Sequence, residues 1–298
     1  MQANGIAIRC QKRGTVWRDI LDLRKLEAED RAWMEACRDS GRHPFSALSF
    51  PTLYCWQEAY GFRVTGGGDW FAVHSEHDGC WYYPCGEKWQ CKAFLRTVCE
   101  SEEHPHFLYL TLQQAEELAK AGFRYLLRDD LSEYICSCHA MALEPDYHTS
   151  RSFREKIRKF QVQQPYQTRQ VSETDLPRLR EAARRCSVGR PDDLALESEL
   201  NAFTALGLRG LLMEIEDGRL AFVLGYPNTK REFVMSIARH EESAPREVTA
   251  VLLHEMARML LGEVPLVNLE DDCGLAGLRR AKMLYSPVDR LNVYEAYK

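Results

Sequence analysis

The sequence lacks the long apolar runs and the charge excess that would identify several classes of protein at once. No stretch approaches the roughly 18 consecutive apolar residues that a membrane-spanning helix requires. Residues 1–18 alternate polar and apolar positions, without the apolar segment of a secretory signal or a lipidation motif. The formal net charge of −5 is too small to imply a charged partner by itself. These absences predict a cytoplasmic protein with no membrane span.

The common catalytic and metal-binding motifs are also missing. The chain has no Gly-x-Ser-x-Gly elbow, His-Glu-x-x-His helix, Walker A loop or dinucleotide-binding glycine fingerprint. Its 11 cysteines, an odd number, include no Cys-x-x-Cys pair. Cys136, Cys138 and His139 leave a zinc site open as an alternative, but alternation along a strand favours small core residues. The sequence therefore predicts reduced thiols and no metal site.

Length and composition describe a soluble globular chain. The 298 residues suffice for two average domains or one large one. Hydrophobic residues make up 45% and charged residues 28% of the chain, which excludes a disordered or collagen-like protein.

Apolar periodicity in the first half predicts helices and strands mixed within one domain. Spacings of three and four predict helices, and short apolar runs separated by glycine-containing turns predict strands. The expected helices cover 20–39, 50–60, 88–99 and 112–121, and the expected strands cover 62–64, 70–74, 80–83, 107–110 and 133–136. Residues 1–142 are therefore predicted to form one α+β domain.

The second half repeats this order of elements. The dipeptide Asp217-Gly218 between two alternating runs is a strong hairpin signal. The expected helices cover 175–186, 194–205, 248–261 and 275–284, and the expected strands cover 210–216, 219–225, 232–238 and 265–269. The recurrence predicts a second α+β domain over 171–298 that packs against the first across a shared face or groove.

A basic segment connects the two halves. Between His148 and Arg190 the chain has 11 lysines and arginines and 4 acidic residues, hence a local charge of +7. An apolar stripe of Phe153, Ile157 and Phe160 predicts a helix within a linker at 143–170. Its cations could neutralise the phosphates of tRNA, although a solvated helix face is the alternative. These candidate nucleic-acid-binding residues are Arg154, Lys156, Arg158 and Lys159.

The order of elements resembles that of a GNAT acyltransferase, in which a three-stranded meander precedes the cofactor-binding helix. A more specific resemblance lies near the C-terminus. The run Val267-Asn-Leu-Glu-Asp-Asp-Cys-Gly-Leu-Ala-Gly-Leu-Arg-Arg-Ala-Lys282, followed by Tyr285 and Pro287, resembles the phosphatidylglycerol lysyltransferase C-terminal-like family. Supporting positions are Phe50, Leu53, Tyr54, Trp56, Tyr83, Pro84, Gly86, 154–160, Glu197 and 208–210.

This resemblance implies a fold, a reaction and a donor. Members of the family resemble tandem GNAT domains, and the characterised lysyltransferases move an aminoacyl group from charged tRNA to a lipid headgroup. The resemblance thus implies a transferase with mixed, mainly antiparallel sheets, and aminoacyl-tRNA as the candidate donor. This chain lacks their membrane-spanning region, so a lipid acceptor is not expected. Residues 240–247, before the long helix, include no glycine to expose N–H groups to a pyrophosphate, so acyl-coenzyme A is not the expected cofactor.

Polar residues that follow the strand expected at 265–269 form the candidate catalytic site. Glu270 and Asp272 are candidate general bases, because an attacking amine must lose its proton during acyl transfer, and Tyr285 is a candidate general acid. The alternatives are that Asp272 only caps the following helix and that Tyr285 only packs against its neighbours. The candidate substrate-binding residues are Glu197, Glu214, Asn268, Arg279 and Lys282. For Glu214, simple solvent exposure on its strand is the alternative.

Two functional hypotheses follow from these patterns. The favoured one is direct transfer of an acyl or aminoacyl group to an amine or hydroxyl acceptor, because no motif places a cysteine as a nucleophile. The competing one is a non-catalytic GNAT-fold module that binds a ligand or a protein. Neither predicts the acceptor or the oligomeric state.

Overall fold

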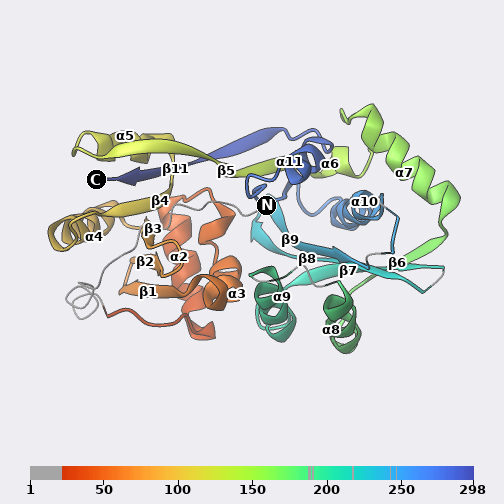
Figure 1. The fold of residues 1–298 in the computed structure, drawn as a ribbon, viewed down its shortest axis with the longest axis horizontal. Coiled ribbons are helices and arrows are strands. Elements are labelled where there is room, and N and C mark those ends of the chain that lie inside the picture. The colour runs from red at the N-terminus through yellow and green to blue at the C-terminus, as the bar shows by residue number, and fades with distance from the viewer. Residues whose placement is uncertain (1–21, 187–188, 190, 217, 242, 246) are drawn as a thin grey trace.

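Helices cover both faces of one long sheet in the computed structural model, which describes residues 22–186, 189, 191–216, 218–241, 243–245 and 247–298 (Figure 1). The sheet has 11 strands in the order β1-β2-β3-β4-β11-β5-β10-β9-β8-β7-β6. The N-terminal half lies on the left of Figure 1 and most of the C-terminal half on the right, with β5 and β11 along the top.

The first half contains a three-stranded meander followed by two helix–strand pairs. Its helices are α2 (Arg31–Gly41), α3 (Phe50–Tyr60), α4 (Lys88–Ser101), α5 (Leu112–Ala119) and the short α6 (Cys138–Met141). Its strands are β1 (Phe62–Gly67), β2 (Trp70–Ser75), β3 (Cys80–Gly86), β4 (His106–Leu110) and β5 (Arg124–Ser137). Strands β1 to β3 pair antiparallel, whereas β4 pairs parallel to β3.

The second half has the same arrangement after two additional elements, α7 (Arg151–Gln163) and β6 (Tyr166–Gln170). The other helices are α8 (Leu176–Arg185), α9 (Asp192–Asn201), α10 (Val248–Leu260) and α11 (Ala276–Met283). The strands are β7 (Arg209–Ile215), β8 (Leu220–Thr229), β9 (Glu232–His240), β10 (Leu266–Asn268) and β11 (Asp289–Tyr297). Here β7 to β9 pair antiparallel and β10 pairs parallel to β9, as β4 does to β3.

The last strand of each half pairs with the other half. Strand β11 pairs antiparallel with both β4 and β5, with Tyr294 opposite Leu110 on one side and Leu127 on the other. Strand β5 in turn pairs antiparallel with β10, with Ile135 opposite Asn268. The division into domains at 1–142, 143–170 and 171–298 stays a prediction, and these strands join its first and last parts into one sheet.

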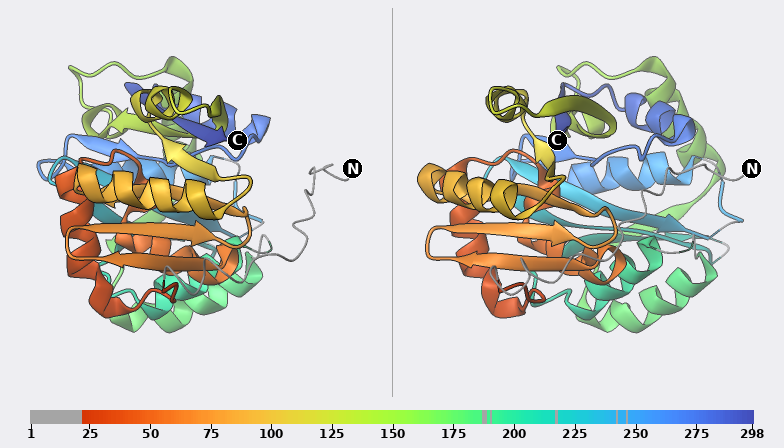
Figure 2. Two further views of the ribbon diagram at one scale, coloured as in Figure 1. Left: turned by 90° about the vertical axis from the view of Figure 1, so that its left-hand side faces the viewer. Right: turned by 60° about the vertical axis from the view of Figure 1, so that its left-hand side comes forward.

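Alternation along the strands places apolar side chains against helices on both faces. In β7, Leu212 belongs to a core shared with α8 and α9, whereas Met213 belongs to a core under α7 and α10. Figure 2 shows α10 above these strands and α8 and α9 below them. The first of these cores crosses between the halves, because it includes Leu53 of α3 and Leu200 of α9, two helices that pack together.

Local sequence explains the bounds of α3. The Ser49 hydroxyl caps the helix by accepting from the backbone N–H of Thr52, and Pro51 occupies the first turn, where no N–H partner is needed. Gly61 ends the helix with a φ of 61°, a left-handed conformation that favours glycine. This helix is confirmed where its sequence pattern predicted it, and its Thr52 and Trp56 reach the site described below.

Several other expected elements start or end elsewhere. The helix expected at 20–39 begins only at Arg31, because Arg24 forms a β-bridge with Val64. Residues 20 and 21 of that expected helix lie outside the described residues. Strand β5 begins at Arg124 rather than at 133, and β6 and β11 were not predicted. The start of β5 is exposed at four successive residues, so it lacks the apolar alternation that identifies a half-buried strand. Within the described residues, no helix is long and apolar enough to cross a membrane.

The exchanged strand β11 should stabilise both halves. Val293 is fully buried in it, so Val293→Ala should lower the free energy of unfolding by about 2 kcal/mol. Urea unfolding measures the loss, and hydrogen exchange should rise in β4 as well as in β5. Val288→Ala, at a 59% exposed position just before the strand, is the matched control and should change little. Faster exchange confined to β5 would contradict the shared role of β11.

Candidate functional site

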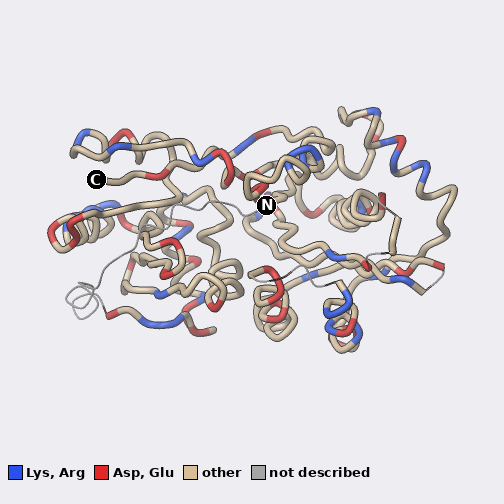
Figure 3. The backbone as a smooth tube through the Cα atoms, viewed as in Figure 1, with Lys and Arg blue, Asp and Glu red and all other residues tan. Residues whose placement is uncertain are grey.

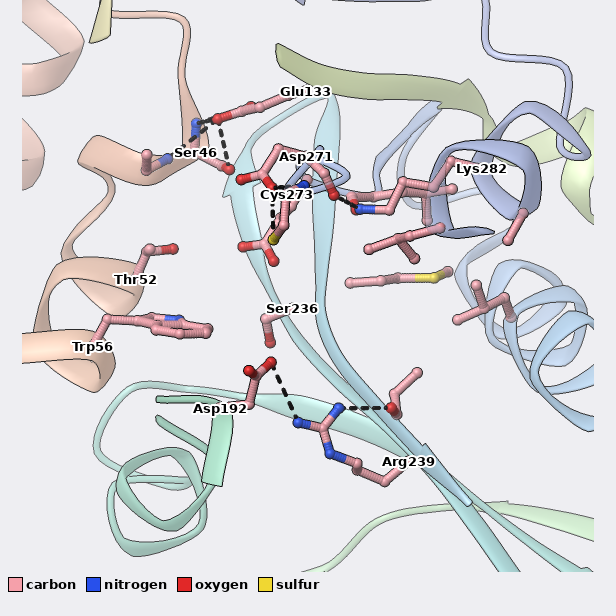
Figure 4. Close-up of a pocket in the computed structure, with 18 of the residues that line it drawn as sticks. Ser46, Thr52, Trp56, Glu133, Asp192, Ser236, Arg239, Asp271, Cys273 and Lys282 are labelled. Atoms are coloured by element: carbon pink, nitrogen blue, oxygen red, sulfur yellow. Dashed lines mark hydrogen bonds and ion pairs between the residues drawn. The ribbon is translucent and has the colours of Figure 1, made fainter. Parts of the chain in front are cut away.

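A cavity of about 320 Å³ lies between the two halves (Figure 4). Helix α3 contributes Thr52 and Trp56 to its wall, and β9 contributes Ser236 and Arg239. The loop 269–273, which follows β10, supplies acidic side chains. Both halves of the chain are therefore needed to form this cavity.

Asn268, the last residue of β10, sets the course of this loop. Its Oδ1 accepts a hydrogen bond of 2.7 Å from the backbone N–H of Glu270, and its Nδ2 donates one of 2.6 Å to Glu133 of β5. Glu270 has a φ of 58°, a conformation rare for residues other than glycine. Asn268 is completely buried, so its side chain supports the loop from beneath.

Glu133 connects this support to the first half. The carboxylate is 2% exposed and accepts from the Ser46 backbone N–H at 2.8 Å and hydroxyl at 3.0 Å, in addition to Asn268. Burial raises the pKa of Glu133, and the hydrogen bonds from Asn268 and Ser46 oppose that rise. Its acceptors are engaged, which fits an anchor for the loop better than a proton-transfer group.

Lys282 of α11 holds the same loop from the other side. Its ammonium, 9% exposed, donates to the backbone carbonyl oxygens of Leu269 and Asp271 (Figure 4). Burial lowers the pKa of Lys282, and the nearby carboxylates of Asp271 and Glu270 act in the opposite direction. An ammonium has three N–H donors, so Lys282 can hold both carbonyl oxygens of the loop and keep one donor. Its positive charge lies beside the cavity.

Glu270 contrasts with these anchored groups. Within the described part of the chain, no hydrogen-bond donor reaches its carboxylate, which lines the cavity. Burial raises its pKa well above the usual range, although the charge of Lys282 opposes this rise. A carboxylate with a raised pKa and no fixed partner has the properties of a general base.

Asp272 belongs to the same loop, but it does not line the cavity. Its buried carboxylate accepts from Arg279 Nε at 2.7 Å, from the Gly274 backbone N–H at 2.9 Å and from the Tyr134 hydroxyl. These hydrogen bonds lower its pKa against the effect of burial. Arg279 also pairs with Asp129 at 2.7 Å. This geometry gives Asp272 and Arg279 the character of positioning residues, and their functional roles stay predictions.

The other predicted site residues lie in three different environments. Tyr285 lines the cavity but is buried against Phe153, with ring centroids 5.2 Å apart, and burial raises its pKa. Glu197 lies outside this cavity and pairs with Arg180 at 3.6 Å, whereas Glu214 pairs with Arg178. The structure therefore brings Asn268, Glu270, Lys282 and Tyr285 to one place and leaves Glu197 and Glu214 away from it.

The basic helix is confirmed as α7, whose Phe153, Ile157 and Phe160 are buried beside α10. Its cations lie along the outer side at the right of Figure 3. Lys159 pairs with Glu247 at 3.0 Å, whereas Arg158 is exposed. Nucleic-acid binding by this helix stays a prediction.

Sequence reasoning missed Glu199, a buried carboxyl of α9. The inward face of α9 consists of Ala195, Leu196, Glu199 and Leu200, so a glutamate within that apolar face was the available signal. Burial raises the pKa of Glu199 to about 7, against a hydrogen bond from Ser236 and the charge of Arg239, which both line the cavity. Glu133, Trp56 and Arg239 were also missed, since only the fold brings them together.

Cysteine chemistry is not favoured at this site. Cys273 lines the cavity at an exposed position, and its Sγ donates to the Asp271 carboxylate at 3.2 Å. Partial desolvation and this carboxylate raise the pKa of Cys273, so the thiolate nucleophile is disfavoured. The described cysteines are free thiols, and the described residues contain no group of three or more His, Cys, Asp or Glu side chains arranged to hold a metal ion.

Solved structures show the same fold at low sequence identity. A conserved protein of unknown function from Bacteroides thetaiotaomicron has a TM-score of 0.81 and 22% identity, over 93% of this chain and 99% of that one. The C-terminal domain of a putative lysylphosphatidylglycerol synthetase from Agrobacterium fabrum has a TM-score of 0.65 and 15% identity, over 91% and 92%. A tandem GNAT protein from the clavulanic acid biosynthesis pathway has a TM-score of 0.52 and 10% identity, over 93% and 98%.

These likenesses confirm the predicted α+β class with a GNAT-like fold. The chain belongs to the family described as phosphatidylglycerol lysyltransferase, C-terminal, whose family model matches residues 40–297. This membership confirms the resemblance found in the sequence. Among curated proteins, none matches the chain.

The raised pKa of Glu199 predicts a pH-dependent stability. The folded state holds this proton more tightly than the unfolded state, so the associated stability is present below pH 4.5 and is lost as the pH rises through 7. The loss amounts to roughly 3 kcal/mol. Glu199→Gln should remove this loss, so urea unfolding at pH 5 and 8 should differ less for the variant than for the wild type. Glu197→Gln, on the same helix and 53% exposed, should behave like the wild type.

Proposed function

We propose that this chain transfers an acyl or aminoacyl group to an amine or hydroxyl acceptor in the cavity between its halves. Family membership and the GNAT-like fold support a transferase, and the observation that carries the site is the half-buried carboxylate of Glu270, which has no hydrogen-bond partner among the described residues. The acidic loop and the aromatic wall, which includes Trp56, suit an acceptor or an acyl group that carries a positive charge.

Glu270 acts as the general base in this proposal. It removes the proton from the attacking amine or hydroxyl as the new bond to the acyl carbon forms. The positive charge of Lys282 then stabilises the tetrahedral oxyanion. Its collapse breaks the bond to the donor's oxygen or sulfur atom, which leaves as a hydroxyl or thiol after taking the proton that Glu270 had removed. Direct transfer is favoured over a covalent enzyme intermediate, because the raised pKa of Cys273 opposes formation of a thiolate.

Aminoacyl-tRNA is the proposed donor. The match to a lysyltransferase family and the exposed cations of α7 support it. Coenzyme A is disfavoured, because the helix that would receive its pyrophosphate, α10, begins after Glu247, which pairs with Lys159. An anion at that position repels phosphate.

A non-catalytic binding module is the second candidate. The missing glycine-rich loop before α10 favours it, since that loop binds the donor in ordinary GNAT enzymes. The two candidates differ in a simple respect: only the enzyme consumes the donor.

Replacement of the proposed base should abolish transfer without unfolding the protein. With aminoacyl-tRNA and a mixture of amines, Glu270→Gln should lower the transfer rate by roughly 100- to 10,000-fold, the typical contribution of a general base. The unfolding midpoint should not fall, because removal of a desolvated carboxyl offsets the loss of its attraction to the charge of Lys282. Transfer is measured by the release of labelled amino acid from tRNA.

Glu263→Gln is the matched control for this experiment. Glu263 follows α10, pairs with Arg209 and lies outside the cavity, so its replacement should leave the rate unchanged. Full activity of Glu270→Gln would reject the assignment of the base. A wild-type protein that binds but never consumes the donor would favour the binding module.

Charge reversal on α7 tests the donor. Arg154→Glu with Arg158→Glu should weaken binding of aminoacyl-tRNA at least tenfold and reduce the slope of log affinity against log salt by about 2. Fluorescence anisotropy across a salt series measures both. The control is Lys92→Glu with Arg96→Glu, an exposed pair with the same spacing on α4. Equal losses of aminoacyl-tRNA affinity in the two double variants would contradict a specific role of α7 and indicate general electrostatic attraction.

A further inference from the structure

Arg239 places a guanidinium with unused hydrogen-bond donors at one side of the cavity. Its side chain is 12% exposed, and its Nη1 donates to the backbone carbonyl of Ala238 at 3.1 Å. Nε and Nη2 have no hydrogen-bond partner among the described residues. Figure 4 shows this guanidinium across the cavity from Asp271 and Lys282, with Ser236 between them. Buried N–H groups that make no hydrogen bond are costly, so this arrangement points to a ligand.

The neighbouring carboxylates do not satisfy Arg239. Asp192 forms an ion pair with Nη2 at 3.6 Å (Figure 4), which is longer than a hydrogen bond, and its own side chain is 47% exposed. Glu199 is a neighbour of Ser236, and its buried Oε2 has no hydrogen-bond partner among the described residues. Because burial raises the pKa of Glu199 to about 7, this group is largely neutral at slightly acid pH and does not cancel the positive charge of Arg239.

The cavity therefore has two chemically different sides. Glu270 and Asp271 present carboxylates on one side, where a cationic amine would be stabilised. Arg239 presents an N–H fork on the other side, where an anionic group would be stabilised. The Ser236 hydroxyl beside it donates to the Leu224 carbonyl oxygen at 3.3 Å, and a hydroxyl can turn its single O–H toward a bound anion instead. A volume of about 320 Å³ is enough for a ligand of amino-acid size between them.

We propose that Arg239 and Ser236 form a subsite for a carboxylate or phosphate group, so that the acceptor is a small zwitterion whose amine faces Glu270. This inference names the acceptor class and rests on the proposed function only for the use of the amine as the nucleophile. Binding of the anionic group to this subsite does not require transfer, so it is tested without any acyl donor.

Isothermal titration calorimetry with three probes tests the subsite. Two probes join an amine to an anion: 4-aminobutyrate carries a carboxylate and O-phosphoethanolamine carries a phosphate. The third, butylamine, carries the amine alone. At least one zwitterion should bind the wild-type protein ten or more times more tightly than butylamine, and the tighter of the two identifies the anion. Arg239→Gln should reduce zwitterion affinity to that of butylamine, while butylamine binding stays unchanged.

The controls separate this subsite from the fold and from the proposed base. Arg258→Gln, at an exposed residue of α10 paired with Glu255, should bind all three probes like the wild type. If Arg239→Gln is unfolded by circular dichroism, Ser236→Ala replaces it and should lower zwitterion affinity about threefold. Equal binding of butylamine and both zwitterions, unchanged zwitterion affinity in the variant, or no binding of any probe would overturn the inference. Failure of the base instead appears as full transfer activity in Glu270→Gln.

Discussion

The buried carboxylate of Glu133 is the interaction on which the candidate site depends. An ionised group inside a protein is tolerated only when donors surround it, and here Ser46 of the first half and Asn268 of the second supply them. Asn268 can orient the backbone of Glu270 because Glu133 fixes its amide. The left-handed conformation of Glu270 in the acidic loop is thus maintained by hydrogen bonds that link the two halves.

The exchange of β5 and β11 explains why the hydrogen bonds of Glu133 connect the two halves of the chain. Glu133 lies on the exchanged strand β5, which pairs with β10 immediately before the acidic loop. The shared core of α3 and α9 closes the opposite wall, so that Trp56 and Arg239 line one cavity. A cavity made from both halves can present unlike chemistry on its two sides, which is the basis for assigning a zwitterionic acceptor.

Local chemistry made part of the site predictable. Asn268, Glu270 and Lys282 follow one another along a strand end, a loop and a helix, so their proximity follows from short-range geometry. The same pattern could not separate Glu270 from Asp272, because both are acidic residues of one loop. Only the packed structure shows that Arg279 and Tyr134 donate hydrogen bonds to the Asp272 carboxylate, whereas Glu270 lines the cavity. Glu197 and Glu214 were chosen from the sequence, but their partners lie elsewhere.

The sequence by itself determined the class, most helices and strands, and the position of the acidic loop, because periodicity, turn residues and capping act over a few neighbours. Tertiary structure alone decided the exchange of the last strands and the convergence of Glu133, Trp56 and Arg239. It also decided the raised pKa of Glu199, which arises from burial against α3 and β9. Strand order and desolvation depend on contacts between residues far apart in the chain, and no local pattern encodes them.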